Sequence, residues 1–388
     1  MHPSTEIRKT PCPAEIAVLR RLTQHSIQVI RRFQDPSGAY PASPSFSAYQ
    51  GYAWLRDGSF TVEAMSRWGE VESANRFHSW VSRVLLDRAD AVKSLVTARQ
   101  HGEPIDVERM LPTRFTLDGR DGEDDWWDYQ TDGYGMWLWA LAVHLDRHGS
   151  SPGPWLPAVQ VAVDYLCAFG GDACYDWWEE HSEHRHISTL GAVQAGLAAA
   201  SAMASLDDGR RAKAKASAAA LLTIILTEGA TGEGAQRHLV KWIGSDAVDA
   251  SLAACITPFR VIPTDDPLAT ATLDKVTNDL DVHGGVHRFA ADVFYGGGHW
   301  LLLSALLGWN RVAAGDVQAG WTYLRWVAEQ ADSGGDLPEQ VDTHLLHPEH
   351  RQEWIDRWGT VATPLLWSHA MFLILADELG LGTAQGVR

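Results

Sequence analysis

The stretch Tyr175–Ala204, YDWWEEHSEHRHISTLGAVQAGLAAASAMA, joins two kinds of sequence that alternate along the whole chain. Its first part is rich in tryptophan, glutamate and histidine, which is typical of a loop that carries function. Its second part, from Ile187 onward, has the apolar periodicity of a helix. Convincing alternating strands are scarce elsewhere in the chain, so the sequence predicts an all-α fold.

Helical periodicity recurs from one end of the chain to the other, and long polar loops separate the helical stretches. We expect helices at Ala14–Phe33, Ser59–Trp68, Ser73–Ala98, Asp132–Arg147, Trp155–Ala168, Ile187–Ala204, Arg210–Leu226, Pro267–Leu280, His299–Ala314, Val317–Gln330 and Pro364–Leu379. No Pro/Ser-rich linker and no short-period repeat interrupts this pattern. A single domain over residues 1–388 is therefore the simplest organisation.

Composition argues against several classes of partner. The chain of 388 residues has a formal net charge of −17, and a protein this acidic is a poor ligand for nucleic acid or for an anionic membrane surface. No apolar run approaches the ~20 residues that a spanning helix needs, and the N-terminal residues do not resemble a signal peptide. The four cysteines (Cys12, Cys167, Cys174 and Cys255) do not form a disulfide framework, which favours a reducing cytoplasm.

Carboxylates beside tryptophans are the first candidates for chemistry in this chain, which holds 18 tryptophans. Glu179 and Glu180 follow a Trp-Trp pair, and Glu339 lies in the loop sequence GGDLPEQ. Cleavage of a glycosidic bond needs one protonated and one ionised carboxyl group, and apolar walls keep a carboxyl protonated by disfavouring its charge. The alternative at this point is that Glu179 and Glu180 are ordinary surface acids.

Two further loops offer polar groups for a ligand. Arg56 and Asp57 are adjacent opposite charges where a helix begins, so they predict either a helix N-terminal acid or a fork of donors and acceptors for sugar hydroxyls. Arg288 precedes the triplet Gly296–Gly298, and its guanidinium offers planar donors. No strand is expected before these glycines, which argues against a nucleotide-binding loop.

Histidine-rich tracts raise the alternative of a metal site. They contain His181, His184 and His186 in one loop and His344, His347 and His350 in another. Neither tract matches a zinc-finger or zincin spacing, and no cysteine accompanies them. We therefore expect no metal, and we expect most of these histidines to be solvated.

Six segments, in this order, carry a family resemblance. They are YAWLRDGSF (Tyr52–Phe60), YQTDGYG (Tyr129–Gly135), YDWWEEHSEHRHIST (Tyr175–Thr189), DAVDASL (Asp246–Leu252), GGVHRFAADVFYGGGHW (Gly284–Trp300) and LPEQ followed by TPLLWSHA (Leu337–Ala370). Together they resemble glycoside hydrolase family 15, the glucoamylase family of inverting, exo-acting α-glucosidases. The resemblance implies an (α/α)6 barrel of six inner and six outer helices, and it implies no metal or organic cofactor.

The resemblance also implies a role for each matching residue. Glu179 would be the general acid, Glu339 the general base, and Tyr52 would sit near the base and the attacking water. The residues implied to bind substrate are Trp54, Arg56, Asp57, Trp178, Glu180, Arg288, Trp300 and Trp367.

The chain departs from the family pattern in ways that bear on the substrate. Phe294 stands where the family commonly has tyrosine, so a hydroxyl group near the pocket is missing. The sequence has no room for an accessory module that grips a polymer. We therefore expect a short α-gluco-oligosaccharide, with isomaltose first. The alternatives are an α-1,4-acting glucoamylase-like or glucodextranase-like enzyme, a trehalase and, outside the enzymes, a sugar-binding barrel.

Overall fold

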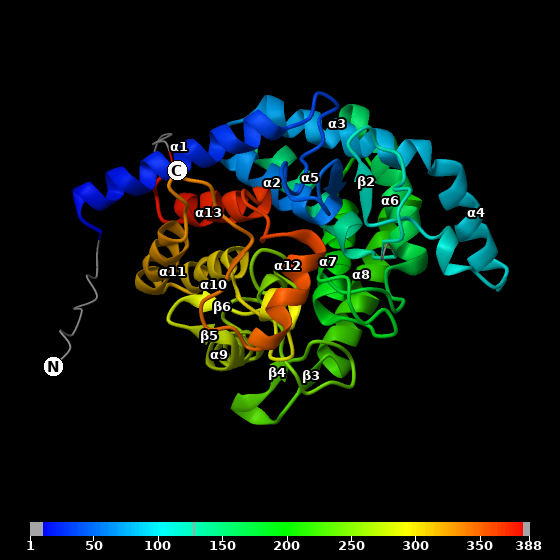
Figure 1. Cartoon of the computed structure of the whole chain (residues 1–388). Coiled ribbons are helices and arrows are strands. Elements are labelled where there is room, and N and C mark those ends of the chain that lie inside the picture. Colours follow the sequence, from blue (N-terminus) through cyan, green and yellow to red (C-terminus); the bar gives the residue numbers. More distant parts are fainter. Residues whose placement is uncertain (1–10, 127–128, 383–388) are drawn as a thin grey trace.

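The computed structural model describes residues 11–126 and 129–382, and its fold is built from helices (Figure 1). The α-helices are α1 (Pro13–Phe33), α2 (Leu55–Arg67), α3 (Val71–Asp87), α4 (Ala89–Gln100), α5 (Asp132–Arg147), α6 (Leu156–Phe169), α7 (Ile187–Ala202), α8 (Asp208–Glu228), α9 (Pro267–Leu280), α10 (Leu301–Ala313), α11 (Val317–Glu329), α12 (Arg351–Trp358) and α13 (Leu366–Glu378). The strands are β1 (Tyr52–Trp54), β2 (Arg114–Thr116), β3 (Ala230–Thr231), β4 (His238–Leu239), β5 (Asp281–Val282), β6 (Gly285–Val286), β7 (His299–Trp300) and β8 (Gln340–Val341).

Six elements pack side by side in a closed cycle at the centre of the molecule. In order round the cycle they are α2, α5, α7, the short 3-10 helix η4 (Ala250–Cys255), α10 and α13, and α13 returns to contact α2. These elements are apolar or small nearly all the way round. All residues from Leu55 to Ser66 of α2 are buried, as are all residues from Leu301 to Asn310 of α10. A helix that is buried on every side belongs to the inside of a fold.

A second layer of helices surrounds this cycle. Helices α1, α3, α6, α8, α9 and α11 each contact at least one inner element, and inner and outer elements alternate along the chain. The predicted (α/α)6 barrel is therefore confirmed, with η4 in place of one inner α-helix. Gly135 and Gly196 let two inner helices touch, because a Cβ atom at Gly196 would lie 2.3 Å from the carbonyl oxygen of Gly135.

The observed elements differ from the predicted ones in three places. The single helix expected over Ser73–Ala98 is two helices, α3 and α4, which meet at Arg88. Helix α2 begins at Leu55, four residues before its predicted start at Ser59, so Arg56 and Asp57 lie inside its first turn. Helix α12 was expected to be loop. Its apolar face is short, with Trp354, Ile355 and Trp358 half-buried and no residue fully buried, and it lies among charged residues.

The N-terminal ends of the inner helices gather at one end of the barrel, and this gathering positions the site. Trp54 immediately precedes α2, Trp300 immediately precedes α10, and Trp367 lies in the first turn of α13. Short strands tie the loops at this end together: β1 pairs with β2, and β7 pairs with β8. None of the helices in the described part of the chain combines the length and apolar composition that crossing a membrane requires.

Candidate active site

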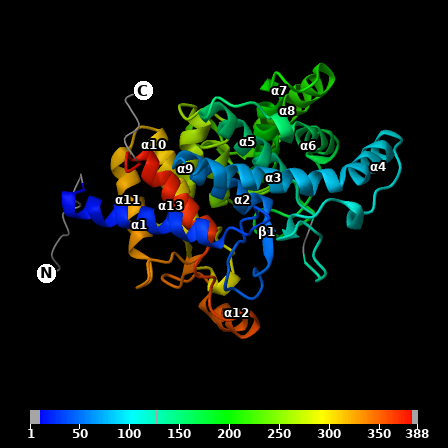
Figure 2. The same ribbon diagram turned by 90° about the horizontal axis from the view of Figure 1, so that it is seen from above.

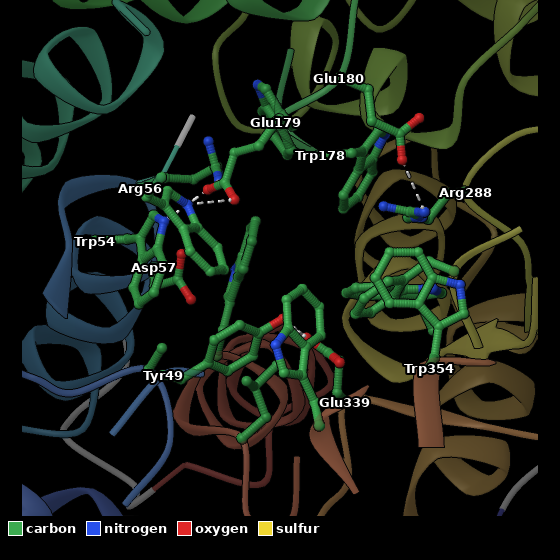
Figure 3. A pocket seen from close by; sticks show the side chains of 18 residues that line it. Tyr49, Trp54, Arg56, Asp57, Trp178, Glu179, Glu180, Arg288, Glu339 and Trp354 are labelled. Carbon is green, nitrogen blue, oxygen red and sulfur yellow. Dashed lines mark hydrogen bonds and ion pairs between the residues drawn. The ribbon is translucent and has the colours of Figure 1, made fainter. Parts of the chain in front are cut away.

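A pocket with a cavity volume of about 180 Å³ opens at this end of the barrel (Figure 3). It is lined by Ala42, Tyr49, Trp54, Arg56, Asp57, Trp126, Trp177, Trp178, Glu179, Glu180, Arg288, Phe294, Trp300, Glu339, Trp354, Trp358, Leu365 and Trp367. The walls are mainly indole rings, and the polar groups are few and charged. Such a combination suits a ligand that has both apolar faces and hydroxyl groups.

Glu179 lies on one wall, and three donors fix its carboxyl group. Oε1 accepts hydrogen bonds from Nε1 of Trp54 at 2.6 Å and from Nη2 of Arg56 at 3.1 Å. Oε2 accepts one from Nε1 of Trp126 at 3.0 Å. The backbone of Glu179 has φ of 63°, a left-handed conformation that is unfavourable for a residue with a side chain. The surroundings must therefore hold this turn in place.

A buried charge network supplies that restraint. Asp176 accepts hydrogen bonds from the backbone N–H groups of Trp178 and Glu180, which lie on either side of Glu179. Nζ of Lys241 lies 2.9 Å from Oδ2 of Asp176 and 2.5 Å from Oδ2 of Asp249, so it bridges the two carboxylates. All three charged side chains are only 3% exposed, so each depends on the others for neutralisation. Asp249 also accepts a hydrogen bond from the indole of Trp178, which orients this pocket wall.

Glu339 lies across the pocket from Glu179 (Figure 3). It directly precedes β8, whose pairing with β7 joins Gln340 to Trp300. The hydroxyl of Tyr49 donates a hydrogen bond to Oε1 of Glu339 at 3.0 Å. Burial raises the pKa of Glu339 to about 8, although this hydrogen bond and the charge of Arg288 oppose the rise.

The two carboxyl groups differ in their electrostatic surroundings. Burial also raises the pKa of Glu179, but the guanidinium of Arg56 and the indole N–H groups of Trp54 and Trp126 oppose the rise. Glu339 has fewer compensating donors. Burial therefore favours the protonated form of both carboxyl groups, and Glu179 has more donors that stabilise its ionised form.

Arg56 and Asp57 form one polar corner of the pocket. Nη1 of Arg56 donates to Gln130 at 2.6 Å and to Asp132 at 3.0 Å, which leaves Nη2 facing Glu179. The carboxylate of Asp57 faces the pocket (Figure 3), and burial raises its pKa to about 7. Asp57 therefore lies in the first turn of α2 and also presents a carboxyl group to a ligand. Its two predicted roles, a helix N-terminal acid and a partner for sugar hydroxyls, are compatible.

Arg288 forms the polar corner opposite. Its Nε donates to Asp292 at 2.8 Å and its Nη2 to Glu180 at 3.2 Å. The guanidinium also lies near the rings of Trp178 and Trp300, at 5.2 Å and 5.1 Å from their centroids. Arg288 and Glu180 thus reach the pocket as an ion pair held between aromatic walls.

The structure brings together every residue that the sequence assigned to the pocket except Tyr52. The hydroxyl beside Glu339 belongs to Tyr49, whereas the hydroxyl of Tyr52 donates to Asp124 at 2.9 Å. Tyr52 does not line the pocket, so its predicted place near Glu339 is corrected. The ring of Tyr52 instead lies against the guanidinium of Arg114, 3.8 Å from the ring centroid, and Arg114 also pairs with Asp124.

Sequence reasoning also missed part of the aromatic lining. The missed residues are Tyr49, Trp126, Trp354 and Trp358. Trp354 and Trp358 lie four residues apart on α12, so they share one face of a helix that was not expected. The spacing of tryptophans in EWIDRW was the available signal.

The histidine tracts lie away from the chemistry of the pocket, because none of the six histidines lines it. His184 stacks on Trp242, with ring centroids 4.4 Å apart, and His350 contacts Glu353 at 2.9 Å. Within residues 11–126 and 129–382, no three His, Cys, Asp or Glu side chains are arranged to hold a metal ion.

An (α/α)6 barrel with two opposed carboxyl groups among tryptophans defines the class of protein as a glycoside hydrolase. The chain belongs to the family described as Glycosyl hydrolases family 15, whose family model matches residues 17–322. It is 59% identical over 367 residues to the isomaltose glucohydrolase of Kribbella flavida, which covers 95% of this chain and 94% of that protein.

Solved structures agree with this assignment. A glycosidase variant in complex with glucose matches with a TM-score of 0.93 and 58% identity, covering 96% of this chain and 100% of that one. A bacterial glucoamylase in complex with acarbose matches with a TM-score of 0.72 and 21% identity, covering 93% of this chain and 56% of that one. The second likeness shows the shared barrel fold.

Proposed function

We propose that this protein is an inverting, exo-acting α-glucoside hydrolase that releases β-glucose from the non-reducing end of short α-glucosides. The proposed substrate is isomaltose, on the strength of the high identity to a protein of that activity. The observation that supports hydrolysis best is that the carboxyl groups of Glu179, 13% exposed, and Glu339, 2% exposed, oppose each other across an aromatic pocket. The reaction needs one of them as acid and the other as base.

Glu179 would be the general acid. Its Oε1 already accepts hydrogen bonds from Trp54 and Arg56, so the transferable proton belongs on Oε2, which accepts from Trp126. When this proton passes to the glycosidic oxygen, the bond between that oxygen and the anomeric carbon breaks. The same three donors then stabilise the carboxylate that remains.

Glu339 would be the general base. Its carboxylate accepts a proton from a water molecule, while the oxygen of that water attacks the anomeric carbon from the face opposite the leaving oxygen. This attack inverts the configuration, so an α-glucoside gives β-glucose. Tyr49 would hold Glu339 in place by its hydrogen bond to Oε1. Inversion requires the two carboxyl groups to stand roughly 6.5–9.5 Å apart, with room for the water.

The remaining polar groups would hold the glucose ring. Arg56 and Asp57 on one side, and Arg288 and Glu180 on the other, offer charged partners for its hydroxyl groups (Figure 3). Trp178, Trp300 and Trp367 would contact its apolar faces. The proposal treats residues 1–388 as one catalytic domain. It places the protein in the cytoplasm, as four free cysteines suggest.

Initial rates on a panel of disaccharides test this proposal. Isomaltose should give the highest kcat/KM, followed by maltose and then trehalose, and a long dextran should be poorer than isomaltose. Proton NMR in the first minutes, before mutarotation, should show the β-anomer of glucose. A first-formed α-anomer would overturn the mechanism, and a kcat/KM on trehalose above that on isomaltose would overturn the assigned linkage.

A further inference from the structure

The aromatic residues of the pocket fall into two groups by exposure. Trp54, Trp178, Trp300 and Trp367 are buried, with exposed fractions between 3% and 9%. Trp126, Phe294, Trp354 and Trp358 are only half-buried, although they line the same pocket. The first group therefore forms the deep wall, and the second group forms the rim where the pocket meets solvent.

The rim closes through a contact between the loop that carries Trp126 and the end of helix α12, which are far apart in the sequence. The rings of Trp126 and Trp358 stack, with centroids 6.0 Å apart and planes inclined by 25°. Trp126 also meets Trp54 at 5.8 Å, and Trp358 meets Phe294 at 6.2 Å. The stacked pair thus links Trp54, which bonds to Glu179, to Phe294, which lies beside Arg288 and Trp300.

The position of Trp126 and Trp358 relative to Glu179 determines which part of the substrate the stacked rings face. Nε1 of Trp126 bonds to Oε2 of Glu179, the oxygen that would carry the transferable proton. The glycosidic oxygen must approach that atom, and the glucose unit to be released occupies the deep pocket. The leaving part of the substrate must therefore lie beside Trp126 and, through it, beside Trp358.

Helix α12 presents its half of the rim from the surface of the molecule. It stands out from the helical body in Figure 2, and none of its residues is buried. Trp354 donates from Nε1 to the carbonyl oxygen of Val293 at 3.0 Å, and Arg351 pairs with Asp342 at 2.8 Å. The first contact holds α12 against the loop that carries Phe294, and the second ties α12 to the segment that follows β8.

We infer that Trp358, held against Trp126, is a specificity-determining residue that restricts the leaving part of the substrate to a single hexose. This inference rests on the proposed function. It adds which residue limits the number of sugar units on the leaving side of the substrate. A second sugar on the leaving side would have to occupy the space of the stacked rings. Selection by such steric exclusion works against the longer substrate without strengthening binding of the shorter one.

Truncation of the rim tests the inference. The measured quantity is the ratio of kcat/KM on isomaltotriose to kcat/KM on isomaltose. Trp358→Ala should raise this ratio by about tenfold, which is the usual scale for relieving a pocket contact of this size. Trp358→Phe keeps an aromatic ring at the rim and should raise the ratio less.

Trp68→Ala is the matched control. Trp68 is also half-buried, but it caps the far end of α2, 12 residues from Arg56 along the chain. It should leave the ratio unchanged. A ratio for Trp358→Ala within twofold of the wild-type value, with isomaltose still cleaved, would overturn the inference and leave the proposed function standing. A wild-type protein that cleaves no α-glucoside would overturn both.

Discussion

The hydroxyl of Tyr49 bonds to Oε1 of Glu339 at 3.0 Å, and Oε2 of the same carboxyl group is buried without a hydrogen-bond partner in the described part of the chain. The two oxygens of the proposed base are thus unlike: one is fixed by a phenol and the other faces the reaction space. A hydrogen bond to a carboxylate favours its ionised form, so Tyr49 helps Glu339 to act as a base.

Tyr49→Phe should therefore reduce kcat/KM on isomaltose by about tenfold or more, because a hydrogen bond to a charged group contributes about 1.5–3 kcal/mol. Tyr52→Phe is the matched control, since its hydroxyl bonds to Asp124. Steady-state rates of the two variants decide between the two tyrosines. A larger loss for Tyr52→Phe than for Tyr49→Phe would contradict the assignment of Tyr49.

Glu179→Gln and Glu339→Gln should each lower kcat by about 10²–10⁴-fold, because an amide can neither donate the proton nor accept it. Circular dichroism should show unchanged helical content for both variants. Glu183→Gln serves as the control, because Glu183 lies in the same loop as Glu179 with a side chain 65% exposed. A variant that kept more than a tenth of wild-type turnover would show that its residue was wrongly assigned.

The pH dependence of kcat/KM should be bell-shaped, because the pair Glu179 and Glu339 is active only while it holds one proton. Burial raises the pKa of Glu339 to about 8 and also raises the pKa of Glu179, so the bell should lie at higher pH than it would for two exposed glutamates. Glu339→Gln removes the group that must be ionised and leaves Glu179 as the titrating member. The residual activity should therefore lose its acid limb and fall only as the pH rises through the pKa of Glu179. A residual activity that stayed bell-shaped would contradict Glu339 as the base.

The free energy of unfolding should also depend on the ionisation of Glu339. The pKa of Glu339 is higher in the folded protein than the value of about 4.3 for an unfolded glutamate, so the folded state binds the proton more tightly. That contribution to stability is complete below about pH 4 and is lost as the pH rises through 8. Glu339→Gln cannot ionise and avoids the loss.

The melting temperature of Glu339→Gln should therefore exceed that of the wild type by about 2–5 °C at pH 8, and by less at pH 5. Glu349→Gln, at a glutamate that is 66% exposed in a neighbouring loop, provides the control. Thermal unfolding at the two pH values measures the difference. Equal shifts at both pH values would contradict a titrating Glu339 as the cause.

The sequence alone determined the helices and the two candidate carboxyl groups. Helical periodicity is a local property, and this is why Asp132–Arg147 and Pro267–Leu280 were predicted with their observed bounds. Glu179 and Glu339 were found because their neighbouring residues form motifs that are contiguous in the chain. Helix α12 was missed because it has only 8 residues, and its Trp354, Ile355 and Trp358 lie among charged residues.

The tertiary structure decided which distant groups meet. Tyr49 and Tyr52 are three residues apart and chemically alike, but the hydroxyl of Tyr49 meets Glu339, whereas that of Tyr52 meets Asp124. The stack of Trp126 on Trp358 joins a loop to the end of helix α12, and no local pattern relates the two segments. The raised pKa values of the two carboxyl groups likewise depend on burial and on donors from other segments, because charge and solvation act through space and not along the chain.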